Sequence, residues 1–136
     1  MNEKIANYLR ANDLLHLSVI HRGRPYGASC FYIFDEKRWA LLFASSPDSV
    51  HMRALVEDWN VAGTIACCDQ SIARLRGVQF QGVARVASEE QKRLYTRKYP
   101  QILAIREPVW AIELHWIKMT DNSLGFGKKI EWRRHS

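Results

Sequence analysis

The residues best suited to chemistry lie between positions 43 and 53, in the run FASSPDSVHMR. Ser46 followed by Pro47 predicts a helix start, because serine caps helices and proline suits the first helical position. The unpaired N–H groups at a helix start, together with the helix dipole, attract anions. Ser45 and Ser49 add hydroxyl groups beside them. The run therefore predicts an anion site of the kind that holds a phosphate.

The same run has a second interpretation. His51 and Arg53 would bring positive charge to a bound anion, whereas Asp48 places a carboxylate at the helix start. In this second interpretation Asp48 satisfies the helix dipole and the serines only cap the helix. The residues alone allow both.

Other kinds of active site are not indicated. The five histidines, at positions 16, 21, 51, 115 and 135, are scattered, and Cys67 is adjacent to Cys68, so no metal-ligand spacing appears. The sequence also lacks a nucleophile elbow and a glycine-rich phosphate loop. We therefore assign no metal site and no catalytic residue, and we interpret the adjacent cysteines as small core residues.

Hydrophobic periodicity predicts the elements that would position these residues. Alternating apolar residues and turn signals predict strands at 15–20, 26–34, 39–45, 61–68, 72–87, 109–119 and 129–133. Helical spacing predicts helices at 3–11, 46–59 and 88–99, with one further turn at 102–105. The sequence SEEQ from Ser88 is typical of a capping box.

Several of these elements carry more specific expectations. The second helix is expected to bury a stripe formed by Met52, Leu55, Val56 and Trp59. The strand at 61–68 is apolar throughout, which predicts burial on both faces. In the next strand Arg74 and Arg76 are expected to share a face, and Gly77 and Gly82 indicate a bulge, a sharp bend or a close backbone approach. The strand at 109–119 places Trp110, Ile112, Leu114 and Trp116 on one face.

The chain has the size and composition of one globular domain spanning residues 1–136. Of its 136 residues, 47% are hydrophobic and 25% charged, which excludes disordered and collagen-like chains. Six or seven antiparallel strands with three or four short peripheral helices predict a mainly β (α+β) protein. A closed or partly closed barrel would protect the edges of so many strands.

Charge and composition also bear on location and partners. No apolar run approaches the ~20 residues that cross a bilayer, and no secretion signal is present, so we expect a cytoplasmic protein with no membrane partner. The net charge of +6 favours an anionic ligand or simply keeps the protein soluble. Nucleic acid ranks lowest because the basic residues are scattered. The basic tail, with Lys128, Lys129, Arg133 and Arg134, either solubilises the chain or folds over a ligand.

Segments along most of the chain resemble the pyridoxamine 5'-phosphate oxidase-like split β-barrels. They are LHLSV at 15–19, ASCFYIFD at 28–35, FASSPDSVH at 43–51 and RGVQFQGVA at 76–84. The runs LRGVQFQG at 75–82 and TDNSLGFGKK at 120–129 are similar to an uncharacterised bacterial branch of that superfamily. The resemblance implies a six-stranded split barrel, a homodimer, and FMN held noncovalently between the subunits.

The resemblance also implies roles for specific residues. The phosphate end of FMN would be lined by Ser45, Ser46, Ser49 and His51. The flavin ring would lie beside Ser29, Cys30 and Phe31. Flavin-binding relatives often carry Arg-Lys where this chain has Val50-His51, and Asp48 adds negative charge nearby, so phosphate affinity is expected to be lower or pH-dependent.

The implied function is that of an FMN-binding flavoprotein of the oxidoreductase class, whose substrate the sequence does not indicate. In such an enzyme the flavin carries the redox chemistry, so a recognisable catalytic constellation is not required. The alternative is a non-catalytic split barrel that binds haem or another ligand, with His16, His51 or His115 as an axial ligand.

Overall fold

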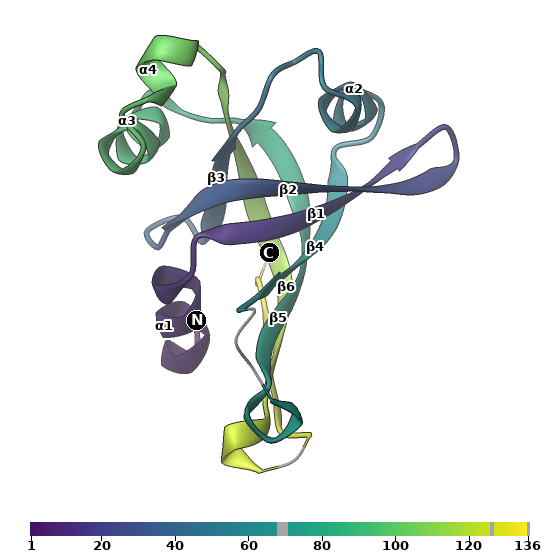
Figure 1. Ribbon diagram of the computed structural model, residues 1–136, viewed down its shortest axis with the longest axis vertical. Coiled ribbons are helices and arrows are strands. Elements are labelled where there is room, and N and C mark those ends of the chain that lie inside the picture. The colour runs from purple at the N-terminus through teal and green to yellow at the C-terminus, as the bar shows by residue number, and fades with distance from the viewer. Residues whose placement is uncertain (68–70, 126, 136) are drawn as a thin grey trace.

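The computed structural model describes residues 1–67, 71–125 and 127–135. The strands run in chain order as β1 (Leu14–His21), β2 (Arg24–Asp35), β3 (Ala40–Ala44), β4 (Asn60–Ala66), β5 (Arg76–Val86), β6 (Val109–Asp121) and β7 (Lys129–Arg133). The α-helices are α1 (Glu3–Ala11), α2 (Val50–Glu57), α3 (Glu89–Lys98) and α4 (Ile102–Ile105). Two 3-10 turns, η1 (Ile72–Arg74) and η2 (Asn122–Leu124), lie at the ends of β5 and β6 (Figure 1).

The strands form one antiparallel sheet that closes on itself. The strand order is β3-β2-β1-β4-β5-β6-β7, and β3 also pairs with β6. Six strands therefore make a closed barrel, and β7 extends it beyond β6. The prediction of a mainly β, antiparallel barrel of six or seven strands with short peripheral helices is confirmed.

Alternation along the strands fills the barrel interior. Leu15, Leu17 and Val19 of β1 are each at most 2% exposed, while the residues between them face outward. The same pattern in the other strands buries large side chains such as Phe43 and Phe80 in one core. Since strand side chains alternate between faces, an apolar set with period two determines which face closes inward.

A bulge between β5 and β6 reverses this alternation. Gln81 pairs with Trp116 and Gly82 pairs with Leu114, so His115 is an extra residue in β6. The predicted bulge near Gly82 is confirmed, but the prediction that Trp116 shares a face with Leu114 is wrong. The extra residue shifts the phase, and Trp116 lies on the outer face, where its indole N–H donates to Glu131 at 3.2 Å.

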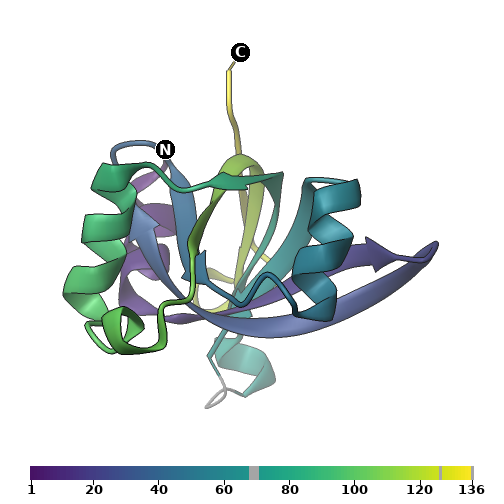
Figure 2. The ribbon, with the colours of Figure 1, turned by 90° about the horizontal axis from the view of Figure 1, so that it is seen from above.

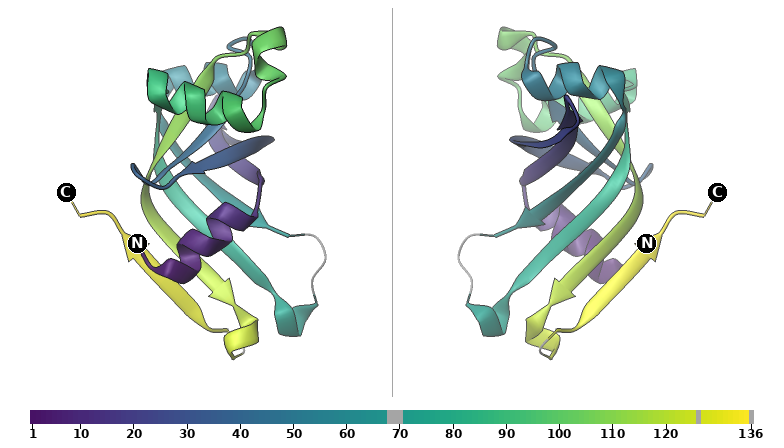
Figure 3. Two further views of the ribbon diagram at one scale, coloured as in Figure 1. Left: turned by 90° about the vertical axis from the view of Figure 1, so that its left-hand side faces the viewer. Right: turned by 90° about the vertical axis from the view of Figure 1, so that its right-hand side faces the viewer.

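The helices cover two regions of the barrel. Figures 2 and 3 show α2, α3 and α4 grouped near one end of the barrel, with α1 against its side toward the other end. The Ser88 capping box is confirmed, and Gln91 of that box also donates to the buried Asp35 carboxylate at 3.0 Å. Asp35 accepts a second bond from Arg38 at 3.1 Å. This polar cluster attaches α3 to the end of β2.

Three predictions about buried residues are wrong. β4 buries Val61 and Ile65 but exposes residues on its other face, because one face of a barrel strand meets solvent. Val56 is 64% exposed because it lies outside the buried stripe of α2. Cys67 follows β4 and is exposed rather than part of the core, whereas Cys68 lies outside the described residues.

One predicted strand boundary also differs. Arg74 belongs to η1 and not to a strand, so the expected shared strand face with Arg76 is wrong. In the C-terminal segment Phe126 lies outside the described residues. Over the described residues, none of the helices is long and apolar enough to cross a membrane.

Candidate functional site

Five of the seven residues predicted to bind a cofactor lie around one pocket of about 250 Å³. They are Ser29, Cys30, Phe31, Ser45 and His51. The wall that completes the pocket comes from α3, α4 and the segment after them, through Tyr95, Tyr99, Gln101, Ile102, Ile105 and Glu107. The pocket therefore lies between β2, the end of β3, α2 and the α3–α4 segment.

Ser46 and Ser49 are not lining residues of this pocket, because α2 begins later than predicted. The helix starts at Val50 with Ser49 as its N-cap, so the expected cap at Ser46 and helical Pro47 are wrong. The preceding residues form a turn in which the Ser49 N–H donates to the Ser46 carbonyl at 3.1 Å. The Ser49 hydroxyl donates to the same carbonyl at 2.8 Å. Backbone hydrogen bonds thus displace the helix start by one turn.

The polar end of the pocket is a serine–histidine pair. Ser45 is 8% exposed, and its Oγ lies 2.6 Å from Nε2 of His51, with Ser49 Oγ at 3.4 Å from the same nitrogen. The N–H groups of Val50 and His51 lie in the first turn of α2, where a helix offers no internal partner. Asp48 is exposed and precedes the helix. This end offers neutral hydrogen-bond donors to a ligand.

The opposite wall is aromatic and held in place by hydrogen bonds to β2. The Tyr95 hydroxyl donates to the Phe31 carbonyl at 3.2 Å, and the Tyr99 hydroxyl donates to the Tyr32 carbonyl at 3.0 Å. The Tyr99 ring centroid lies 4.8 Å from that of Tyr95 and 6.1 Å from that of Phe31. Phe31 is 57% exposed, so its ring is available to a ligand.

No lysine or arginine lines the pocket within the described chain. Burial lowers the pKa of His51, which favours the neutral imidazole, and burial raises the pKa of the Cys30 thiol to about 11. The pKa of Tyr99 is raised to about 12, mainly by burial. Among the lining residues that the structure describes, Glu107 is the one carboxylate.

The lowered pKa of His51 predicts an acid-sensitive contribution to stability. The unfolded chain, with an imidazole pKa near 6.5, binds this proton more readily than the folded chain. The free energy of unfolding should therefore fall as the pH drops from about 7.5 to about 5.5, and replacing His51 by asparagine should remove this part of the slope. Urea denaturation across that range measures it. A matched variant of the exposed His135, His135→Asn, should keep the wild-type slope, and an equal loss of slope in both variants would contradict the assignment.

The sequence offered little sign of the α3–α4 wall. Tyr95 and Tyr99 follow helical spacing, which predicts core packing, and no motif distinguishes Gln101 or Glu107. The structure brings these residues to β2 through contacts between positions about 60 residues apart in the chain, such as those of Tyr95 with Phe31. Their place in the pocket could therefore not be inferred from local pattern.

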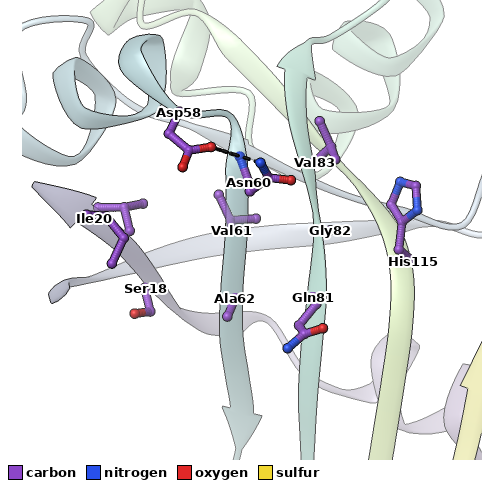
Figure 4. A pocket seen from close by; sticks show the side chains of 11 residues that line it. Ser18, Ile20, Asp58, Asn60, Val61, Ala62, Gln81, Gly82, Val83 and His115 are labelled. Atoms are coloured by element: carbon purple, nitrogen blue, oxygen red, sulfur yellow. Dashed lines mark hydrogen bonds between the residues drawn. The ribbon is translucent and has the colours of Figure 1, made fainter. Parts of the chain in front are cut away.

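The other histidines considered as haem ligands, His16 and His115, do not line this pocket. His16 Nδ1 is 2.9 Å from Ser29 Oγ on the outer face of the sheet, in a shallow hollow of about 400 Å³ between β1, β2 and β4. His115 is at a separate groove where β1 diverges from β4 (Figure 4). Among the described residues no cluster of three or more His, Cys, Asp or Glu side chains is placed to hold a metal.

The groove in Figure 4 is larger, at about 580 Å³, but none of the seven residues predicted to bind a cofactor lines it. Asp58 faces it, and its Oδ1 accepts hydrogen bonds from the backbone and side-chain nitrogens of Asn60 at 3.0 and 2.9 Å. These bonds lower the pKa of Asp58. We therefore place the candidate site in the smaller pocket, where five of the predicted residues meet.

Proteins of known sequence are similar to this chain over nearly its whole length. No family model matches it. A UPF0306 protein of Serratia proteamaculans is 35% identical over 136 residues, covering 97% of this chain and 94% of the relative. The UPF0306 protein Cj1449c of Campylobacter jejuni is 38% identical over 133 residues, covering 97% and 98%.

Solved structures share the fold at low sequence identity. The haem storage protein HutZ of Vibrio cholerae superposes with a TM-score of 0.67 at 15% identity, covering 83% of this chain and 89% of that one. An FAD-binding protein of Mesorhizobium loti gives a TM-score of 0.68 at 14% identity, covering 88% and 94%. These likenesses establish the common barrel and do not identify a ligand.

Proposed function

This chain belongs to the UPF0306 family, and from that premise and the pocket described above we propose that it is an FMN-binding split-barrel protein of the oxidoreductase class. The observation that carries the proposal is the meeting of Ser29, Phe31, Ser45 and His51 in one pocket. These residues come from three separate elements and were each expected to contact the flavin. The structural neighbour from Mesorhizobium loti is named as an FAD-binding protein, which supports a flavin as the ligand class.

The residues present fit the two chemically different parts of FMN. An exposed Phe31 ring and the neighbouring backbone of β2 offer an aromatic and hydrogen-bonding wall for the flavin ring. The first turn of α2 offers N–H groups and the Ser45–His51 pair to the phosphate. Because these phosphate donors are neutral, we expect weaker FMN binding than a site with a lysine or arginine would give. When bound, FMN would supply hydride or electron transfer.

A second copy of the chain would complete this site. The pocket of about 250 Å³ is at the lower limit of ligand sites, which usually run from ~300 to ~1,000 Å³. Ser29 borders both the pocket and the hollow on the outer face of β1, β2 and β4. Apart from His16, the outward-facing residues of that hollow are small, namely Ser18, Gly27, Ser29 and Thr64, which would allow another sheet to approach closely. We therefore place the FMN-binding pocket at the edge of a homodimer interface.

The test compares FMN with riboflavin, which has the same ring and no phosphate. Replacing Val50 by arginine and His51 by lysine should strengthen FMN binding at least about tenfold, since a charge-assisted bond contributes about 1.5 kcal/mol or more, and should leave riboflavin binding unchanged. Fluorescence quenching of each flavin measures both affinities, and light scattering gives the mass of the assembly. Glu57→Lys, at the far end of α2, controls for a general change in charge.

Two results would reject this proposal. One is that neither the wild type nor the double variant retains a visible chromophore or a thermal shift with excess FMN. The other is that Glu57→Lys strengthens FMN binding as much as the double variant does.

Haem is the second candidate, and one observation favours it. His51 lines the pocket and its lowered pKa favours the neutral imidazole, which is the form that ligates iron. The neighbour HutZ is named as a haem storage protein. A parallel titration with haemin separates the candidates, because haem ligation through His51 would produce a Soret shift that is lost in His51→Ala.

A further inference from the structure

A carboxylate without a partner lies at the α4 side of the pocket. Glu107 is partly buried and lines the pocket together with Phe31 and Tyr99. Within the described residues no side chain or backbone group forms a hydrogen bond or ion pair with it. The neighbouring Arg106 is exposed and forms no ion pair with it in the part of the chain described. A charge that is partly removed from water without a partner is costly, so this one is available to a ligand.

The charges around Glu107 leave it uncompensated. Burial favours the neutral forms of the His51 imidazole and the Cys30 thiol. Glu107 also raises the pKa of the Cys30 thiol and of the Tyr95 hydroxyl by its negative charge, although burial is the larger cause for both. The charge of this carboxylate therefore reaches Cys30 and Tyr95, and beside these residues it favours a cation over an anion.

The rings of Phe31 and Tyr99 line the same pocket as Glu107 and are also suited to a cation. A cation within ~6 Å of a ring centroid is attracted by the negative face of the ring. Lys98 already shows this on Tyr99, with its Nζ 5.3 Å from the ring centroid, although Lys98 is not a lining residue of the pocket. The Tyr99 hydroxyl is committed to the Tyr32 carbonyl, so the ring is held in a fixed position.

Resting on the proposed role of this pocket as a ligand site, we propose that its Glu107 end is a subsite for a protonated organic amine, held by the Glu107 carboxylate and the rings of Phe31 and Tyr99. The amine N–H groups donate to the carboxylate, and the carbon groups next to the nitrogen pack on the rings. The subsite thus assigns a substrate class, organic amines that are cationic at neutral pH, to a pocket that the Ser45–His51 pair also lines. Glu107 is its specificity-determining residue.

The experiment uses three small probes of one shape on the protein without added flavin. Benzylamine is a cation at neutral pH, benzyl alcohol is its neutral counterpart and benzoate is an anion. Ligand-observed NMR titration gives the affinity of each. The wild type should bind benzylammonium at least about tenfold more tightly than benzyl alcohol, and benzoate most weakly, as a charge-assisted bond predicts.

Two variants locate the effect. Glu107→Gln keeps the shape of the side chain and should abolish the preference for benzylammonium over benzyl alcohol. Glu89→Gln, on the outer side of α3 with its side chain 80% exposed, should keep the wild-type preference. Circular dichroism confirms that both variants are folded. If the wild type binds benzyl alcohol or benzoate as tightly as benzylammonium, or if Glu107→Gln retains the preference, the subsite is rejected.

The outcome is separable from that of the flavin test. A preference for the amine that depends on Glu107 supports the subsite even where FMN fails to bind, and that combination rejects the flavin only. FMN binding without any amine preference rejects the subsite only.

Discussion

Replacing Gly82 by alanine is expected to lower the free energy of unfolding by about 3 kcal/mol, the upper part of the range for overpacked cores. A Cβ at this position would lie 2.3 Å from the Glu113 carbonyl oxygen and 2.9 Å from Cγ2 of Ile112. The closer atom is backbone in the neighbouring strand, so it cannot move without disturbing the β5–β6 ladder at its bulge. The strain falls on the strand that carries His115 and Trp116.

Gly27 provides the matched control in another strand of the same sheet. Its nearest neighbour would be the Leu17 carbonyl oxygen at 3.8 Å, an ordinary contact. Gly27→Ala should therefore change stability by no more than about 0.5 kcal/mol. Urea denaturation of both variants measures the difference. Equal losses would show that general glycine effects, and not the close approach at Gly82, determine the result.

Replacing Asp35 by alanine is expected to cost about 3 kcal/mol of stability, because it removes the acceptor of a buried cluster. The Asp35 side chain is 1% exposed and accepts from Gln91 and Arg38. Its loss leaves the buried Gln91 amide without this acceptor, whereas the Arg38 side chain, at 32% exposed, regains water. The largest loss should therefore be felt where Gln91 joins α3 to the barrel.

The effect should extend to the pocket. α3 carries Tyr95, and Tyr99 follows directly, so loosening α3 should weaken the aromatic wall. Hydrogen exchange should show faster exchange of α3 amides in Asp35→Ala than in the wild type. Asp35→Asn keeps an acceptor oxygen and should lose only about 1 kcal/mol, with α3 protected. An equal loss in the two variants, or unchanged exchange in α3, would show that the cluster does not anchor the helix.

Two groups of lining residues give the pocket different chemical preferences. The Ser45–His51 pair beside α2 offers neutral donors to an anion. Glu107 and the rings of Phe31 and Tyr99 offer a carboxylate and aromatic faces to a cation. The probes proposed above measure the preference for a phosphate and the preference for an amine independently.

Much of the barrel could be predicted from the sequence because the relevant physics is local. Period-two alternation in β1 marked Leu15, Leu17 and Val19 as the inward face, and the structure buries all three. The Ser88–Gln91 capping box and the bulge at Gly82 were also evident from short stretches of residues. The alternation and the capping box depend on residues that are close together in the sequence, and the bulge was indicated by a glycine inside a strand pattern.

The start of α2 and the face of Trp116 depended on structure beyond the local pattern. Ser46 followed by Pro47 has the residue types of a helix start. In the structure the Ser46 carbonyl instead accepts a hydrogen bond from the Ser49 N–H in a turn, and the helix begins after Ser49. In the sequence Trp116 alternates with Leu114, but His115 is an extra residue opposite β5 and places Trp116 on the outer face. In both cases a competing hydrogen-bond arrangement, which residue types alone do not rank, decided the outcome.

By itself the sequence determined the order of the strands and helices, the inward face of β1 and the run in which Ser45 and His51 would be found. Only the tertiary structure decided that α3 and α4 fold back over β2, and so brought Tyr99 and Glu107 to the same pocket. The reason is that such a wall requires contacts between residues more than 60 positions apart, such as the 67 that separate Tyr99 from Tyr32. Those contacts exist only once the barrel has closed.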